Sequence, residues 1–249
     1  MSFTRTPAPT EGEVEPGVHR LGSRRVNWYV LEDEGRYTVV DAGLPTHYGQ
    51  LLEFLESRGT GLDAVEALVL THGHVDHVGF AERLRQEGVP VYAHEGDDEL
   101  LRNGGGPLPG FFVRNVYRPS VAAYLLEAVR SGAREVSPVE SFFAGADGER
   151  LTVPGRPEVM HVPGHSAGQC ALWLPDRETL LVGDAVVTWD VRSGRATDPI
   201  LPAVLADGRG AFESLSRFES LGSVTLLSGH GDPWRGEASD AVQLAWTGG

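Results

Sequence analysis

Residues 67–77 read Ala-Leu-Val-Leu-Thr-His-Gly-His-Val-Asp-His, an apolar run followed at once by four side chains that can bind metal: His72, His74, Asp76 and His77. Neutral imidazole is a good ligand for zinc, iron and copper. In an extended loop alternate residues point the same way, so His72 and His74 can face one position. Asp76 and His77 are adjacent and diverge toward a second position. The motif therefore predicts a metal site, and its spacing indicates two metal ions.

Three further candidate ligands stand beside glycine at the end of an apolar run. They are His165, Asp184 and His230. A sheet protein gathers side chains from distant segments into one cleft where its strands end. A lone histidine at such a place is usually structural, but three such residues together with the dense motif favour a common site. Asp41, which ends another apolar run, could orient a ligand histidine or serve as a turn residue.

The seven donors can be divided between two metal ions. One ion could be held by His72, His74 and His165, the other by Asp76, His77 and His230, and the two oxygens of Asp184 could bridge them. This division leaves room for a bridging hydroxide. Two ions about 3.5–4 Å apart lower the pKa of bound water toward about 7 and polarise a carbonyl or phosphoryl oxygen.

The composition limits the classes of function. The 249 residues suffice for one large domain or two small ones, and 41% of them are hydrophobic, enough for a core. A net charge of −14 argues against a nucleic-acid-binding surface. All 21 basic residues are arginine, which excludes a P-loop and a Schiff base. Cys170 is the only cysteine, so no disulfide forms within the chain.

The hydropathy of the chain predicts where it acts. Residues 1–17 are polar and lack the apolar segment of a signal peptide. No apolar stretch approaches the ~20 residues that cross a membrane. We therefore expect a cytoplasmic protein that acts on a small molecule as a monomer or homodimer, with neither a nucleic acid nor a membrane as partner.

Apolar periodicity predicts strands mixed with helices. We expect strands over residues 26–31, 37–40, 65–70, 89–93, 151–153, 159–162, 170–174, 180–182 and 224–227, and helices over 48–58, 78–86, 119–130, 211–221 and 238–246. This order suggests two sheets covered by helices on their outer faces. Residues 1–17 are expected to form a flexible arm, and residues 18–249 a single domain with a helical insertion near 104–132.

The metal motif resembles that of a known family. The segments Thr71–His77, Gly164-His165, Gly183-Asp184 and Gly229-His230 are similar to those of the metallo-β-lactamase superfamily of binuclear metal hydrolases, and they span nearly the whole chain. The resemblance implies a four-layer αββα sandwich, of α+β or α/β class, and the ligand assignment given above. It also implies two divalent metal ions, with Zn²⁺ expected and Fe or Mn as alternatives.

The chain departs from several branches of that superfamily. Asp184 stands where one major branch of class B β-lactamases has cysteine, which weakens the antibiotic-hydrolase interpretation. The chain ends soon after His230, so we expect a glyoxalase II-like or lactonase-like protein without the C-terminal helical domain of glyoxalase II. Lactonases carry a tyrosine three residues after the bridging aspartate, and this position is Val187 here.

We expect hydrolysis of an ester-type bond, in a lactone, a thioester or a related acyl compound. In this interpretation a bridging hydroxide attacks the carbonyl while the metal ions stabilise the oxyanion and the leaving group. Asp76 could take part in proton handling if it coordinates a metal ion through one oxygen only. Four aromatic residues of the insertion could bind the acyl group, or could instead cover the core or a dimer interface: Phe111, Phe112, Tyr117 and Tyr124.

Three other functions compete with this one. The superfamily also contains mononuclear non-haem iron dioxygenases that act on persulfides, and His72, His165 and Asp184 could hold one iron. Residues 164–168 match the G-x-S-x-G motif of serine hydrolases, which would make Ser166 the nucleophile. That interpretation requires a helix after the motif, whereas the sequence predicts a strand. The third alternative is a metal-binding protein without catalysis.

Overall fold

Adjacent residues of the central strands pack into different cores, because successive side chains of a strand point to opposite faces of the sheet. On strand β5 (Val65–Val69), Leu68 belongs to the core on the outer side of its sheet, whereas Ala67 and Val69 belong to the core between the two sheets. The structure, a computed structural model, describes residues 12–248.

The first sheet contains seven strands in the order of the sequence. They are β1 (Gly12–Glu15), β2 (Val18–Gly22), β3 (Asn27–Asp33), β4 (Arg36–Val40), β5, β6 (Val91–Ala93) and β7 (Phe143–Ala144). Strands β1 to β4 pair antiparallel, and β4 to β7 pair parallel. The parallel arrangement brings the ends of β4, β5 and β6 to the same edge of the sheet, where the metal motif begins.

The second sheet has the strand order β14-β13-β10-β9-β8. Its strands are β8 (Glu158–His161), β9 (Cys170–Leu174), β10 (Thr179–Gly183), β13 (Ser223–Ser228) and β14 (Trp234–Glu237). A separate hairpin joins β11 (Val187–Asp190) to β12 (Arg195–Ile200). Strands β10 and β13 are parallel neighbours, so the residues that follow them, including Asp184 and His230, lie at one edge.

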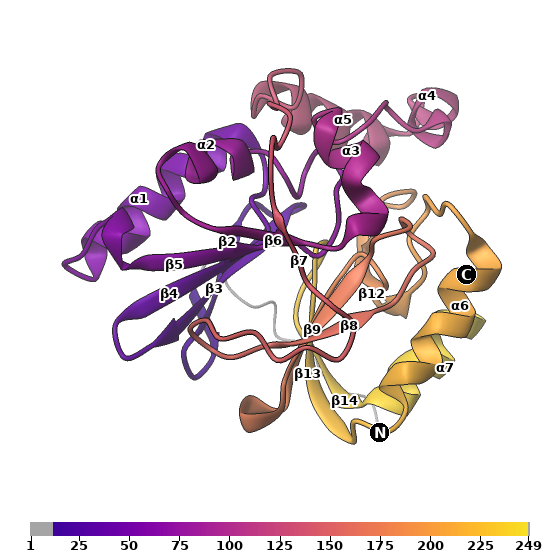
Figure 1. Ribbon diagram of the computed structural model, residues 1–249. Helices are drawn as coiled ribbons and strands as arrows, with labels where there is room; N and C mark the ends of the chain where they lie inside the picture. Colours follow the sequence, from indigo (N-terminus) through magenta and orange to yellow (C-terminus); the bar gives the residue numbers. More distant parts are fainter. Residues whose placement is uncertain (1–11, 249) are drawn as a thin grey trace.

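Helices cover the outer face of each sheet, as Figure 1 shows. The helices are α1 (Tyr48–Ser57), α2 (Ala81–Gln86), α3 (Asp98–Arg102), α4 (Gly110–Asn115), α5 (Pro119–Arg130), α6 (Gly208–Leu215) and α7 (Ala238–Thr247). Leu51 of α1 and Leu84 of α2 pack on the first sheet, and Leu215 of α6 and Val242 of α7 on the second. These layers confirm the predicted αββα sandwich.

Most predicted elements are present, but several differ from the prediction or were not predicted. Residues 151–153 form no strand, although Leu151 is buried between the sheets, because the backbone turns back there and Leu151 N donates to Pro157 O. Helix α2 begins at Ala81, since Gly79 N donates to the backbone beside β4. The hairpin β11–β12 was not predicted from the sequence, and neither were β2, β7, β14, α3 and α4.

The predicted N-terminal arm is wrong in part. Residues 1–11 lie outside the described residues, but residues 12–15 form β1, which pairs with β2. The arm prediction took polar composition as a sign of flexibility, whereas an edge strand needs only backbone hydrogen bonds on one side. Helices α4 and α5 occupy the predicted insertion at 104–132. No helix within residues 12–248 combines the length and hydropathy needed to span a membrane.

Candidate metal centre

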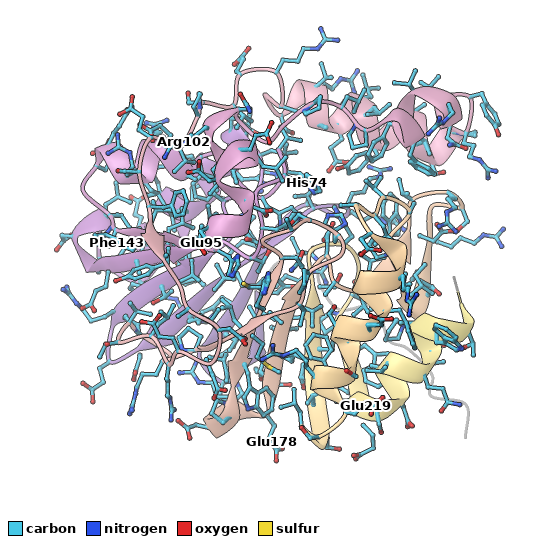
Figure 2. All side chains as sticks on the ribbon, turned by 45° about the vertical axis from the view of Figure 1, so that its right-hand side comes forward. His74, Glu95, Arg102, Phe143, Glu178 and Glu219 are labelled. Carbon is cyan, nitrogen blue, oxygen red and sulfur yellow. The ribbon has the colours of Figure 1, made fainter. Side chains whose placement is uncertain are left out.

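Loops that follow four strands converge between the two sheets. The loop after β5 carries His72, His74, Asp76 and His77, and the segments after β8, β10 and β13 carry His165, Asp184 and His230. Figure 2 shows His74 where the two halves of the sandwich meet. The structure therefore brings all seven predicted donors together.

The donor atoms form overlapping groups that can hold metal. Within each group the ligand atoms lie within 4.8 Å of one another: His72 with His74 and His165, Asp76 with His77 and His230, and His72 with His77 and Asp184. The first two groups are the two sets that the sequence analysis proposed. The third group joins them through Asp184.

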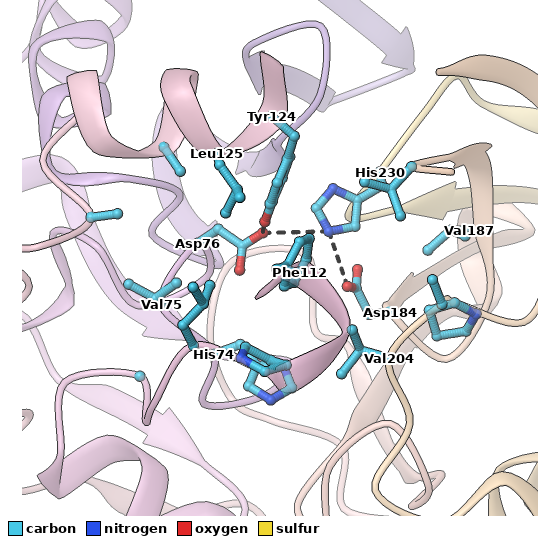
Figure 3. A pocket seen from close by; sticks show the side chains of 18 of the residues that line it. His74, Val75, Asp76, Phe112, Tyr124, Leu125, Asp184, Val187, Val204 and His230 are labelled. Atoms are coloured by element: carbon cyan, nitrogen blue, oxygen red, sulfur yellow. Dashed lines mark hydrogen bonds and ion pairs between the residues drawn. The ribbon is translucent and has the colours of Figure 1, made fainter. Parts of the chain in front are cut away.

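Asp184 lies between the two histidine sets. Its Oδ2 is 3.0 Å from His230 Nε2 and 3.5 Å from His165 Nε2, and its Oδ1 is 3.5 Å from His77 Nε2. Figure 3 shows His230 next to both Asp184 and Asp76. A single carboxylate thus faces histidines of both sets, the arrangement that a bridging ligand requires.

Two buried atoms test whether these residues suit a metal ion. His77 Nε2 and Asp184 Oδ1 have no hydrogen-bond partner within the described part of the chain. An unpaired buried polar atom is costly and rare. Imidazole nitrogen and carboxylate oxygen are ligands of Zn²⁺, Fe²⁺ and Mn²⁺. A cation between these atoms satisfies both, so the residues fit divalent metal ions.

Asp41 forms hydrogen bonds with two residues of the segment Thr71–His77. Its carboxylate accepts hydrogen bonds from Thr71 N at 2.7 Å and Thr71 Oγ1 at 2.8 Å, and Oδ2 lies 2.8 Å from His77 Nδ1. This contact turns His77 Nε2 toward the centre. Asp41 also has φ +61°, so it turns the chain at the end of β4 as well. These contacts and this backbone angle fit both roles considered for Asp41, and the orienting role stays a prediction.

Other backbone contacts orient the remaining rings. His165 Nδ1 lies 2.9 Å from Val204 O, and His230 Nδ1 contacts Arg25 O. Gly229 is required beside His230, because a Cβ there would lie 2.3 Å from Asp184 Oδ1. The glycine next to a ligand therefore reflects close packing of the backbone against the centre.

Asp97 ties two of the ligand loops together, and the sequence analysis missed it. Its Oδ2 accepts from Gly73 N at 2.8 Å and Ser166 Oγ at 2.7 Å, and its Oδ1 accepts from Gly168 N at 2.7 Å. Gly73 lies between two ligand histidines, and Ser166 follows His165. The signal that could have found Asp97 is its place just after β6, next to the other parallel strand ends.

Ser166 is not a nucleophile. Its hydroxyl donates to Asp97, and it does not line the cavity beside the metal ligands. Strand β9, rather than a helix, follows residues 164–168. A nucleophile elbow needs a strand, a sharp turn and a helix, so the serine-hydrolase alternative is wrong.

Three of the histidines are neutral. Burial lowers the pKa of His72, His74 and His165, because it penalises the charged ring, and the pKa of His165 falls to about 4. The neighbouring rings add to the effect at His72. A metal ligand must be unprotonated, so this set is ready to bind at neutral pH.

The other two histidines carry protons when no metal ion is bound. Burial disfavours charge on His77 and His230, but nearby carboxylates outweigh burial and raise their pKa to about 10 and about 9. Asp41 and Asp184 act most strongly on His77, and Asp184 on His230. In turn, burial raises the pKa of Asp184, yet the two histidines hold it well below its usual range. The buried carboxylates are thus stabilised by positive charge next to them, which protons on His77 and His230 supply in the absence of metal ions.

A cavity of about 370 Å³ opens above the donors. His74, Asp76, Asp184 and His230 line it together with mainly apolar residues. Its volume lies in the range of small-molecule sites, about 300–1,000 Å³.

Two of the four predicted substrate residues line this cavity. Phe112 and Tyr124 stack at 5.3 Å between ring centroids, and Tyr124 Oη donates to Asp76 Oδ2 at 2.7 Å. Phe111 packs against Phe112 but is not among the lining residues. Tyr117 is 73% exposed and also lies outside the cavity. Phe111 and Tyr117 thus do not line this cavity, and their predicted role in binding an acyl group stays a prediction.

Replacement of Asp97 by asparagine is expected to weaken metal binding. Asp97→Asn replaces one accepting oxygen with a donor, so the loops that carry His74 and His165 lose a shared partner. Loss of such an outer contact typically costs 10–100-fold in metal affinity. Asp98→Asn is the matched control, since Asp98 forms an ion pair only with the exposed Arg102 among residues 12–248. Competition with a chromogenic chelator measures both, and equal affinities would contradict the role of Asp97.

Metal binding is expected to release protons. His77 and His230 are protonated at pH 7 in the metal-free protein, because their pKa values are about 10 and about 9. Binding must displace about two protons per chain, so affinity falls as the pH is lowered. Titration calorimetry of Zn²⁺ in buffers of different ionisation enthalpy counts the protons. A heat that is independent of the buffer would show that no proton is displaced.

Comparisons with known proteins agree with this centre. Residues 21–230 match the family model of the metallo-beta-lactamase superfamily. The chain is 30% identical to YflN of Bacillus subtilis, a probable metallo-hydrolase, with 98% of this chain and 96% of that protein covered. It is 25% identical to the hydroxyacylglutathione hydrolase GloC of Haemophilus influenzae, with 81% and 83% covered.

The solved structures show the same fold. A metallo-beta-lactamase family protein from Thermus thermophilus superposes with a TM-score of 0.66 at 26% identity, covering 93% of this chain and 78% of that one. The matched region contains every donor described above, from His72 to His230. The chain therefore belongs to the metallo-beta-lactamase superfamily.

Proposed function

We propose that this protein uses two metal ions, with Zn²⁺ as the expected metal, to hydrolyse an ester-type bond in a lactone, a thioester or a related acyl compound. The coarser class, a metal-dependent hydrolase, follows from the superfamily and from relatives named as metallo-hydrolases. In the reaction the hydroxyl of water joins the carbonyl carbon, the acyl C–O or C–S bond breaks, and the leaving oxygen or sulfur takes a proton.

One observation carries the proposal. Asp184 faces histidines of both sets, while its Oδ1 and His77 Nε2 lack hydrogen-bond partners among the described residues. His72, His74 and His165 would hold one ion, and Asp76, His77 and His230 the other, with Asp184 shared. When bound, such ions supply an activated water of lowered pKa and polarise the carbonyl.

The protein's own residues handle protons and position the substrate. Asp76 lines the cavity, and burial raises its pKa, but His77 and His230 outweigh burial and keep it ionised as a proton acceptor. Tyr124 donates to Asp76 Oδ2 and leaves Oδ1 of the same carboxylate for other contacts. Burial raises the pKa of Tyr124 well above its usual range, so its hydroxyl remains a donor.

The alternative with one iron uses fewer of these residues. Iron held by His72, His165 and Asp184 would leave Asp76, His77 and His230 without a ligand role, although their donor atoms also lie within 4.8 Å of one another. This second convergent set supports hydrolysis over persulfide oxidation.

Metal analysis together with a substrate panel tests the proposal. Protein grown in defined medium is expected to contain two zinc ions per chain and to hydrolyse some of the esters, lactones and thioesters. A chelator should abolish this activity, Zn²⁺ should restore it, and a fluorophosphonate should leave it unchanged. One iron per chain with oxygen uptake on a persulfide would establish the dioxygenase instead. Full metal occupancy without turnover of any compound would indicate a binding protein.

Removal of one hydroxyl tests the link between Tyr124 and Asp76. A hydrogen bond to a charged group contributes about 1.5–3 kcal/mol, so Tyr124→Phe is expected to lower kcat/KM about ten- to a hundredfold. Tyr117→Phe makes the same chemical change on the same insertion, but Tyr117 is exposed and its loss should have no effect. Metal content is measured on both variants. Indistinguishable kcat/KM values would remove Tyr124 from the reaction.

A further inference from the structure

The walls of the cavity above the metal ligands are poor in hydrogen-bonding side chains. Among the described residues that line it there is no Ser, Thr, Asn, Gln, Lys or Glu. The hydroxyl of Tyr124 is already engaged by Asp76. Most of the wall is aliphatic or aromatic, including Leu125, Val129, Trp189 and Ile200. A ligand that fills this space must therefore be apolar along most of its length, because most polar groups would lose their water without gaining side-chain partners.

Two separate segments build these walls. One is the insertion that contains α4 and α5, and the other runs from β11 through β12 to Val204. They are tied together where Ser120 Oγ donates to Arg192 O at 2.9 Å. Phe112, Tyr124 and Trp189 form a continuous aromatic contact across the gap, with ring centroids 5.3 and 6.3 Å apart. The apolar character is thus a property of the whole cavity and not of one segment.

Two lining residues outside the metal-ligand set are charged, and only one of them is available. Asp190 accepts hydrogen bonds from Arg192 N at 2.9 Å and Ser193 N at 3.2 Å, so its carboxylate is used by the turn of the hairpin. Arg134 is exposed and forms no hydrogen bond or ion pair with any residue between 12 and 248. An available guanidinium at the solvent side of an apolar cavity is suited to a carboxylate or another anion.

We propose that the substrate of this site is an ester or thioester whose reacting carbonyl is joined by an apolar segment to a single anionic group, and that Arg134 binds this group at the mouth of the cavity. The inference rests on the proposed hydrolase function and deepens it. The carbonyl lies at the floor, where the metal ligands are, the apolar segment lies along the walls, and the anion meets the one free cation of the described lining.

The proposed substrate class differs from hydroxyacylglutathione, the substrate in the name of the relative GloC. A hydroxyacylglutathione carries two carboxylates, an amino group and two peptide amides. The described lining offers Arg134 for one carboxylate and no side-chain amide or hydroxyl for the peptide groups, apart from the engaged Tyr124. The protein is therefore expected to prefer the S-hexanoyl thioester of N-acetylcysteamine to S-lactoylglutathione.

Matched ester pairs test the anion and show on which side of the scissile bond it lies. Mono-4-nitrophenyl adipate and 4-nitrophenyl hexanoate differ only by a carboxylate on the acyl side, and 4-acetoxybenzoate and phenyl acetate by one on the leaving group. Arg134→Gln is expected to lower the anionic-to-neutral ratio of kcat/KM about two- to fivefold in one pair, the effect of an exposed ion pair. Arg130→Gln is the control, since Arg130 is exposed on the same insertion but does not line the cavity.

A length series tests the apolar walls. Across 4-nitrophenyl acetate, butyrate and hexanoate, kcat/KM is expected to rise about fourfold for each methylene that the cavity buries. A flat series, or a preference for S-lactoylglutathione over the hexanoyl thioester, would overturn the inference.

A binding measurement separates this inference from the hydrolase proposal. The ethers 6-(4-nitrophenoxy)hexanoate and 6-(4-nitrophenoxy)hexanamide cannot be hydrolysed, and their binding is followed by quenching of tryptophan fluorescence, since Trp189 lines the cavity. If the carboxylate binds more tightly than the amide and Arg134→Gln removes the difference, the cavity assignment holds even if no ester is turned over. If Arg134→Gln changes neither the binding ratio nor the kinetic ratios, the assignment is wrong whatever the hydrolase assay shows.

Discussion

The centre depends on the burial of three carboxylates among five histidines at the junction of two sheets. Asp41, Asp76 and Asp184 are all nearly inaccessible to solvent, and buried carboxylates are tolerated only when cations or hydrogen-bond donors compensate them. In the metal-free protein, protons on His77 and His230 compensate the negative charge of the carboxylates. Divalent ions can replace those protons. Asp184 is the residue on which this balance turns, because it faces both histidine sets.

The surrounding backbone keeps these charges at fixed positions. Asp41 is hydrogen-bonded to Thr71 and His77. Asp97 accepts hydrogen bonds from Gly73 in one ligand loop and Gly168 in the other. Both aspartates follow parallel strands of the first sheet. The loops that carry the candidate ligands are therefore anchored at strand ends by hydrogen bonds, which suits a site that holds metal ions in a fixed geometry.

The candidate metal donors and most of the cavity wall belong to different parts of the chain. The strand ends supply the donors, whereas the insertion with α4 and α5 and the hairpin β11–β12 supply the cavity above them. Tyr124 is the contact between the two parts, since it lies on α5 and donates to Asp76. A change in the cavity walls can alter the substrate without disturbing the strands, which agrees with the general rule that function lies in sites placed on a common fold.

The sequence alone identified the seven candidate donors and predicted the layers. Closely spaced histidines beside an apolar run are a local pattern that can be recognised without knowledge of the packing. The same holds for glycines next to His165, Asp184 and His230. Only the tertiary structure decided which other side chains reach the centre. Asp97 is distant in sequence from the residues that it ties together, and only its place after β6 pointed to the centre. The hairpin strand β12 contains Pro199, which weakens the sequence signal of a strand. Likewise Tyr117 and Tyr124 are equivalent by composition, and only the packing of α5 buries one and leaves the other in solvent.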